Sequence, residues 1–177
     1  VTGHSEIGWG NFLFLDTTAF SGASAAVWNS TAPTSNVFSV ASSSYINPSG
    51  SDVIAYCFAP VEGYSKFGKY TGNGSADGPF IYTGFRPRWI MWKKSSSLGQ
   101  WFIHDTARGT YNFSDLELAA DSSAAEYSAS GIGAGERLDF LSNGFKSRTS
   151  NGASNASGAT YIYAAFAENP FKTARAR

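Results

Sequence analysis

The residues best suited to acid–base chemistry stand in the stretch WFIHDTARG, where His104 precedes Asp105 and Arg108 follows three residues later. A histidine beside a carboxylate can act as a general acid or base. Adjacent residues of a strand, however, point to opposite faces of a sheet, so these two side chains cannot readily pair with each other. We therefore interpret the stretch as structural and expect the chain to contain no catalytic residue.

Other reactive side chains are scattered. Cys57 is the only cysteine and stands in the apolar run DVIAYCFAP, so we interpret it as a buried small hydrophobic residue. Two isolated histidines, His4 and His104, give no zinc-ligand spacing. No arrangement of the carboxylates fixes the separation that glycoside hydrolysis needs. The sequence thus predicts no metal site and no cofactor.

Two glycine clusters raise the question of a nucleotide site. The first, TGNGSADGP, lies between two aromatic runs, and its Asn-Gly and Asp-Gly pairs suit tight hairpin turns. Lys69 precedes this cluster instead of ending it, which does not fit a phosphate-binding loop. The second cluster, GIGAGE at residues 131–136, lacks the spacing and the surrounding strand and helix of a dinucleotide site. Both clusters are predicted to be loops.

Composition narrows the class of protein. Of the 177 residues, 42% are hydrophobic and 15% are charged, which suits one β-rich domain with neutral polar surfaces. Thirteen basic residues balance thirteen acidic ones, and the one basic run is the short terminal FKTARAR. Such a chain lacks the positive field that binds nucleic acid. No apolar run approaches the roughly 20 residues of a membrane helix, so we expect no nucleic acid partner and no membrane insertion.

Short apolar or alternating runs between turn residues predict an all-β fold. We expect an antiparallel, jelly-roll-like β-sandwich with room for one short helix at residues 114–127. The expected strands cover residues 11–15, 37–41, 53–60, 67–72, 80–85, 88–94, 100–105, 138–141, 144–148 and 160–168. Trp89 and Trp92 lie three apart on one of these strands, so one is expected in the core and the other nearer the surface.

Two parts of the chain resemble each other. Six matching residues run in the same order in both copies: Asn47, Ser49, Gly50, Ile54, Phe58 and Ala59 correspond to Asn155, Ser157, Gly158, Ile162, Phe166 and Ala167. We interpret residues 1–63 as the later part of a first repeat and residues 64–177 as a complete second repeat, together forming one compact β domain. Because the chain opens on Val1 with an incomplete copy, we expect it to be a fragment or a processed product.

The strand that closes the first copy has a particular pattern. Along residues 53–59, large apolar side chains alternate with small apolar ones. Apolar residues on both faces predict burial on both sides, either between layers or at a subunit contact.

Four longer stretches occur in order along the chain: AYCFAPVEGYSKFGKYTGNGSADGPFIYTGFRPRWIMWKK, DTARGTYN, DFLSNGFKSRT and NASGATYIYAAFAENPFK. In these stretches the chain resembles the C-terminal repeat modules of tail-fibre-like and other virion structural proteins of tailed bacteriophages. The resemblance implies a virion protein that assembles in the cytoplasm of the bacterial host. Its implied partners are other virion proteins and copies of itself, with a trimer as the expected homo-oligomer. The resemblance implies no catalytic or binding residue.

We therefore expect a non-enzymatic module that recognises a glycan or a protein on the bacterial surface through loops and exposed aromatic rings. The candidate ligand-binding residues lie in three loops and are Asn73, Asp77, Arg108, Tyr111 and Asn151. The alternatives are a capsid-decoration or tail-assembly protein with no receptor, a polysaccharide depolymerase, and a lectin.

Overall fold

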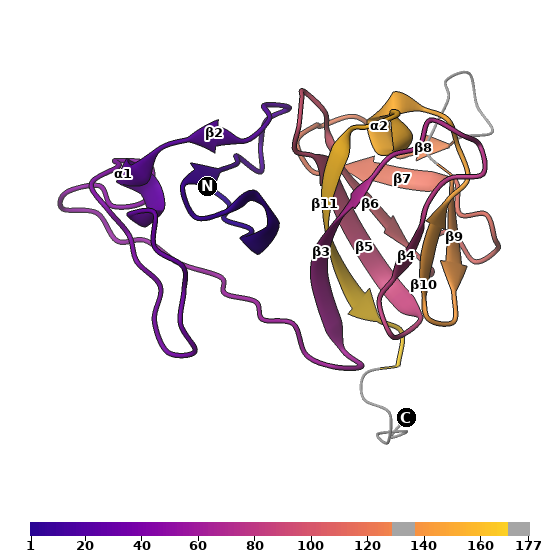
Figure 1. Ribbon diagram of the computed structural model, residues 1–177, viewed down its shortest axis with the longest axis horizontal. Coiled ribbons are helices and arrows are strands. Elements are labelled where there is room, and N and C mark those ends of the chain that lie inside the picture. The colour runs from indigo at the N-terminus through magenta and orange to yellow at the C-terminus, as the bar shows by residue number, and fades with distance from the viewer. Residues whose placement is uncertain (129–136, 170–177) are drawn as a thin grey trace.

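The computed structural model describes residues 1–128 and 137–169, so the glycine cluster at 131–136 and the terminal basic run lie outside the described residues. Strands in the described ranges form three antiparallel sheets (Figure 1). The six-stranded sheet has the order β3 (Ser65–Thr71), β11 (Thr160–Ala167), β5 (Pro87–Lys94), β6 (Trp101–Asp105), β7 (Leu116–Ala119) and β8 (Tyr127–Ser128). The three-stranded sheet has the order β4 (Phe80–Tyr82), β10 (Gly144–Ser147) and β9 (Leu138–Leu141). The third sheet pairs β1 (Asn11–Phe12) with β2 (Gly22–Ala23).

The two larger sheets face each other and enclose the main core. On β11, Tyr161, Tyr163 and Ala165 alternate with outward residues and join this core. From the other sheet, the ring of Phe145 packs edge-on against Tyr163, with 5.3 Å between ring centroids. Aromatic side chains from both sheets thus interdigitate as in a sandwich, and the expected all-β antiparallel sandwich is confirmed.

The expected division of the two tryptophans of β5 is also confirmed. Trp92 is fully buried in the main core, whereas Trp89 is half-buried on the opposite face of the six-stranded sheet. The odd spacing of three residues places them on opposite sides of the strand.

The outer face of the six-stranded sheet is partly covered by the N-terminal lobe, drawn in indigo and purple in Figure 1. Leu13 is buried there against Trp101 and Ile162. The indole N–H of Trp101 donates to the backbone oxygen of Phe14 at 2.8 Å. One turn of 3-10 helix, η1 (Ser5–Ile7), and one of α-helix, α1 (Ala25–Trp28), belong to this lobe. The lobe therefore forms a partial third layer over the sheet.

Two expected strands are absent. Residues 37–41 and 53–60 form no strand, and residues 51–60 are exposed throughout. Ile54 and Tyr56 are each 82% exposed, and Cys57 is exposed as well. The prediction of a strand buried between layers of the chain was therefore wrong, as was the prediction of a buried cysteine, whereas burial of this segment at a subunit contact stays a prediction. The reason lies in pairing: β11, the repeat counterpart of 53–60, has β3 and β5 on its two edges, whereas no described strand lies beside 53–60.

The helix expected at residues 114–127 was also wrong, because β7 and β8 occupy this region. Glu117 and Ala119 are buried while Leu118 between them is exposed, which is the two-residue period of a strand. Pairing of β7 with β6 therefore overrides the helix propensity of alanine and glutamate. Short helices occur elsewhere, namely α1 and α2 (Gly152–Asn155).

The other expected strands correspond to strands of the structure, although residues 11–15 and 80–85 shorten to β1 and β4. The expected boundary between residues 63 and 64 falls directly before β3. Among the described helices, none has the length and apolar character needed to cross a bilayer.

Candidate functional site

The five candidate residues divide between the two ends of the sandwich. Asn73 and Asp77 lie in the loop that leaves β3, and Asn151 lies in the loop that leads into β11 at the same end. Arg108 and Tyr111 follow β6 at the opposite end. The fold thus brings three of the five together and separates the other two from them.

A fully buried amide, Asn155, holds the first two loops together. Its Oδ1 accepts the backbone N–H of Asn73 at 2.8 Å. Its Nδ2 lies 2.7 Å from the backbone oxygen of Ser75, 2.8 Å from that of Thr149 and 3.0 Å from Oδ1 of Asn73. The amide of Asn73 is therefore used to fix loop geometry and is not presented to a ligand.

Asp77 and Asn151 are engaged within the protein in a similar way. Asp77 lies 3.0 Å from Nζ of Lys146 and 3.6 Å from the guanidinium of Arg148. The hydrogen bond from Lys146, together with its charge, lowers the pKa of Asp77. Oδ1 of Asn151 accepts the N–H of Ala153 at 3.0 Å and so caps α2. This end of the sandwich presents paired charges and satisfied amides.

At the opposite end, Arg108 is neutralised by two carboxylates. Its Nε donates to Asp105 at 2.6 Å and its Nη1 to Glu126 at 2.6 Å. Tyr111 is 85% exposed, so it offers a single aromatic surface to solvent. At this end the charge of the arginine is therefore paired and the tyrosine is an isolated exposed ring.

The residues that most resemble a catalytic set lie in the core. Nδ1 of the fully buried His104 is 3.3 Å from Oγ of Ser114, and its Nε2 is 3.4 Å from Oε2 of Glu117. Serine, histidine and carboxylate in a row can perform nucleophilic catalysis when a substrate reaches the serine. Ser114 and Glu117 are also buried, so the serine is not exposed to a substrate and this set does not indicate nucleophilic catalysis. Asp105 pairs with Arg108 and not with His104, as the strand alternation predicted.

Burial of the histidines predicts a loss of stability in mild acid. Burial lowers the pKa of His104, against smaller opposing effects of Glu117, and it also lowers the pKa of His4. The unfolded chain binds these protons near pH 6.5, before the folded protein does, so stability is lost as the pH falls below that value. We expect urea unfolding to show a decrease of up to about 2 kcal/mol for His104 between about pH 7.5 and pH 5. The His104→Gln variant should show a smaller decrease, and an equal decrease in this variant would contradict the assignment.

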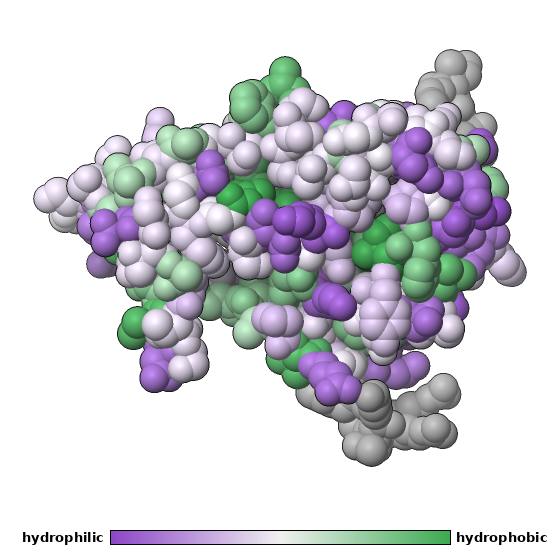
Figure 2. Space-filling view, viewed as in Figure 1, coloured by the Kyte–Doolittle hydropathy of each residue, from purple (hydrophilic) through white to green (hydrophobic). Residues whose placement is uncertain are grey.

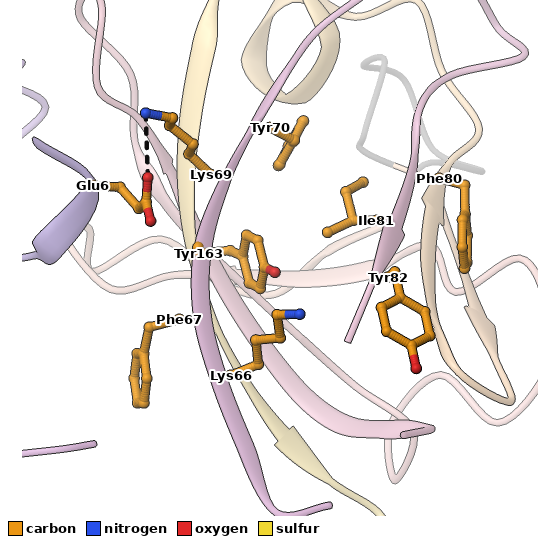
Figure 3. Close-up of a pocket in the computed structure, with 10 residues that line it drawn as sticks. Glu6, Lys66, Phe67, Lys69, Tyr70, Phe80, Ile81, Tyr82 and Tyr163 are labelled. Atoms are coloured by element: carbon orange, nitrogen blue, oxygen red, sulfur yellow. Dashed lines mark ion pairs between the residues drawn. The ribbon is translucent and has the colours of Figure 1, made fainter. Parts of the chain in front are cut away.

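A groove runs between β3 and β4, the edge strands of the two large sheets (Figure 3). No ladder joins these strands, so the sandwich is open along this side. The first part of the groove has a volume of about 370 Å³, and a second part of about 480 Å³ lies between residues 60–67 and 82–84. Figure 2 shows hydrophobic residues beside hydrophilic ones over these strands.

Two aromatic rings form the β4 wall of the groove. Phe80 and Tyr82 are 46% and 57% exposed because Ile81, between them, turns into the core. A Cβ on Gly144 of β10 would clash with the backbone oxygen of Ile81 and would lie 2.9 Å from the ring of Phe80, so β4 and this ring pack closely on a glycine there. Nζ of Lys66 lies 5.3 Å from the centroid of the Tyr82 ring, within cation–π distance.

Tyr163 reaches the groove from β11 past Gly68 of β3. These two residues are paired in register, and a Cβ on Gly68 would lie 2.8 Å from the tyrosine hydroxyl. Tyr163 is only 4% exposed, yet among the described residues its hydroxyl has no hydrogen-bond partner. Burial, with a contribution from the charge of Glu6, raises the pKa of Tyr163 to about 12. The hydroxyl therefore stays protonated at neutral pH and can donate a hydrogen bond, and Figure 3 shows it directed into the groove.

The N-terminal segment supplies one charged residue at the groove. Glu6 of η1 pairs with Lys69 of β3 at 3.2 Å, the dashed contact in Figure 3. His4 holds this turn in place: its Nδ1 accepts the N–H of Glu6 at 3.2 Å, and its Nε2–H donates to the backbone oxygen of Tyr163 at 3.2 Å. The acceptor role of Nδ1 requires a neutral ring, which agrees with the lowered pKa of His4.

The groove combines an aromatic platform, a free hydroxyl donor and two lysines. This set can stack on a ring and hydrogen-bond to its substituents. In the first part of the groove, Glu6 is the one carboxylate among the described lining residues, and it is paired with Lys69. A search of the described ranges finds no group of three or more His, Cys, Asp or Glu residues that could hold a metal ion.

Sequence reasoning did not select Lys66, Tyr82 or Tyr163. The stretch around Lys66 and Tyr82 was interpreted as strands joined by tight hairpin turns. The strands β3 and β4 bear out the first part, but they belong to different sheets, so the segment between them is a connection and not a hairpin turn. The two-residue alternation shows which side chains share a face of a strand. It does not show that the edges of two different sheets lie side by side, and this non-local contact creates the groove.

Comparison with protein families gives one match. Residues 1–170 match the family model described as a domain of unknown function, DUF7483, and the chain belongs to this family. No curated protein and no solved structure matches the chain significantly.

Proposed function

We propose that this member of the DUF7483 family is a non-catalytic recognition module that binds a glycan in the groove between β3 and β4. The observation that carries the proposal is the buried Tyr163, whose hydroxyl has no described partner, beside the exposed ring of Tyr82. Sugars present apolar CH faces that stack on aromatic rings and hydroxyl groups that accept hydrogen bonds. Exposure alone does not carry the proposal, since Tyr111 is more exposed than Tyr82; what distinguishes Tyr82 is that it lines the groove.

The sequence resemblance to phage virion modules supports a place for this groove at the surface of a virion. There the ligand would be a glycan of the bacterial surface, and copies of the chain would assemble with each other, a trimer being the expected form. The balanced charge of the chain agrees with a partner other than nucleic acid.

Recognition without bond cleavage fits the groove better than depolymerase activity. Glycoside hydrolysis needs two facing carboxyl groups, one of which has a raised pKa. In the first part of the groove Glu6 is tied to Lys69. The set of His104, Ser114 and Glu117 is a weaker alternative, because all three residues are buried.

A second function, assembly without a receptor, is favoured by the exposed apolar segment at residues 53–60. Phe58 of this segment packs against Phe67 and Phe166 at the end of the six-stranded sheet. A second copy of the chain would cover such a surface in an assembled particle. This function predicts no glycan binding, which the following experiment measures.

The test is an array of bacterial surface glycans, probed with the whole chain and two variants. Tyr82→Ala removes the platform of the groove and should weaken binding about tenfold, the loss expected for one aromatic contact. Tyr111→Ala, the control, removes a more exposed tyrosine at the opposite end of the molecule and should leave binding unchanged. Bound glycans should be recovered at their original length.

Three results would contradict the proposal. Shortened glycans would indicate a depolymerase. A loss of binding in Tyr111→Ala but not in Tyr82→Ala would move the site to the loop after β6. A blank array would favour the assembly function.

A further inference from the structure

Lys66 is a cation of the groove that has no anionic partner among the described residues. Glu6 pairs with Lys69 at 3.2 Å, whereas no described carboxylate forms an ion pair with Lys66. Its Nζ lies over the ring of Tyr82 instead, 5.3 Å from the centroid. Lys66 borders both parts of the groove, and Glu62 lines only the second part. An ammonium group is thus available in the first part, on the aromatic platform itself.

A hydrogen-bond donor accompanies this cation. The hydroxyl of Tyr163 has no partner among the described residues, and Figure 3 shows it and the ammonium of Lys66 directed into the same space beside Tyr82. Both groups donate, and the ammonium is charged. The two oxygens of a carboxylate accept two such bonds, and a carboxylate also balances the positive charge. A neutral hydroxyl could accept one of the bonds but would leave the charge unbalanced.

We propose that the groove selects acidic glycans: the carboxylate of a sugar acid, such as a uronic acid, binds Lys66 and Tyr163 while the sugar ring stacks on Tyr82. This inference rests on the proposed function of the groove. Charge-assisted hydrogen bonds are stronger than neutral ones, but water and salt screen an open groove. The expected gain in affinity from the carboxylate is therefore about tenfold at low salt.

The test compares each acidic oligosaccharide of the glycan array with the same oligosaccharide after reduction of its carboxyl groups to alcohols. The wild-type chain should bind the acidic form about tenfold more tightly, and the preference should shrink as salt is raised. Lys66→Gln should abolish the preference while neutral glycans still bind. The control is Lys94→Gln, since Lys94 also lies over a tyrosine ring, that of Tyr161 at 5.8 Å, but does not line the groove. This variant should keep the preference.

The outcomes separate this inference from the proposed function. Equal binding of acidic and reduced glycans that still depends on Tyr82 would overturn the acidic selectivity and leave glycan recognition standing. Loss of the preference in Lys94→Gln as well as in Lys66→Gln would also overturn the acidic selectivity assigned to the groove. So would tightest binding of phosphorylated glycans. Absence of binding to any glycan would contradict the proposed function, and this inference with it. Thermal unfolding of each variant establishes that it is folded.

Discussion

Replacing Trp92 with alanine is expected to lower the free energy of unfolding by about 4 kcal/mol. Trp92 is fully buried, and its ring lies 5.8 Å from Phe102 and 4.9 Å from His104, measured between centroids. Truncation would remove this packing and leave a cavity between the two large sheets. The effect can be measured by urea unfolding at neutral pH.

Two further substitutions sharpen this prediction. Trp89→Ala, on the half-buried outer face of the same strand, should cost only about 1 kcal/mol. Trp92→Phe should cost clearly less than Trp92→Ala, because the indole N–H of Trp92 has no hydrogen-bond partner among the described residues and its removal leaves nothing unpaired. Similar losses at positions 89 and 92 would contradict the assignment of the core to the inner face.

Replacing Asn155 with alanine is expected to cost about 3 kcal/mol. The substitution would remove the acceptor of the Asn73 N–H and the donor shared by Asn73, Ser75 and Thr149. Polar groups of two adjoining loops would lose their partners inside a buried site. Urea unfolding measures the loss, and faster hydrogen exchange at the amide of Asn73 would locate it.

The repeat supplies a matched control for this substitution. Asn47 is the counterpart of Asn155 in the first copy, but it is exposed and its Nδ2 makes one hydrogen bond, to the backbone oxygen of Ala41 at 3.0 Å. Asn47→Ala should therefore cost less than about 1 kcal/mol. Equal losses for the two asparagines would show that burial of the amide is not what stabilises the loops.

The sandwich could be predicted from the sequence because its signal is local. Alternation along β5 placed Trp89 and Trp92 on opposite faces, and the same two-residue period separated His104 from Asp105. Both predictions follow from the geometry of a single strand and require no knowledge of its neighbours. The helix expected at residues 114–127 was wrong because pairing with β6, a partner outside the segment, decided the outcome.

Non-local contacts also explain what sequence reasoning missed. Residues 53–60 and β11 share a pattern, but only β11 has β3 and β5 beside it. The five loop residues selected from the sequence are polar or aromatic, yet the structure uses most of them in internal contacts. Lys66, Tyr82 and Tyr163 come from three strands, and they meet because the edges of two sheets adjoin. The spacing of residues along the chain does not indicate that the edges of these two sheets lie side by side.

The most direct test of the account is to map the ligand on the protein. A nitrogen-15-labelled chain would be titrated with the glycan that binds best on the array, while backbone amide chemical shifts are followed by NMR. Binding in the groove predicts that the largest changes occur at Lys66, Gly68 and Tyr82, with little change at Tyr111. Largest changes around Tyr111, with the groove amides unmoved, would contradict the central claim, as would the absence of any glycan that binds.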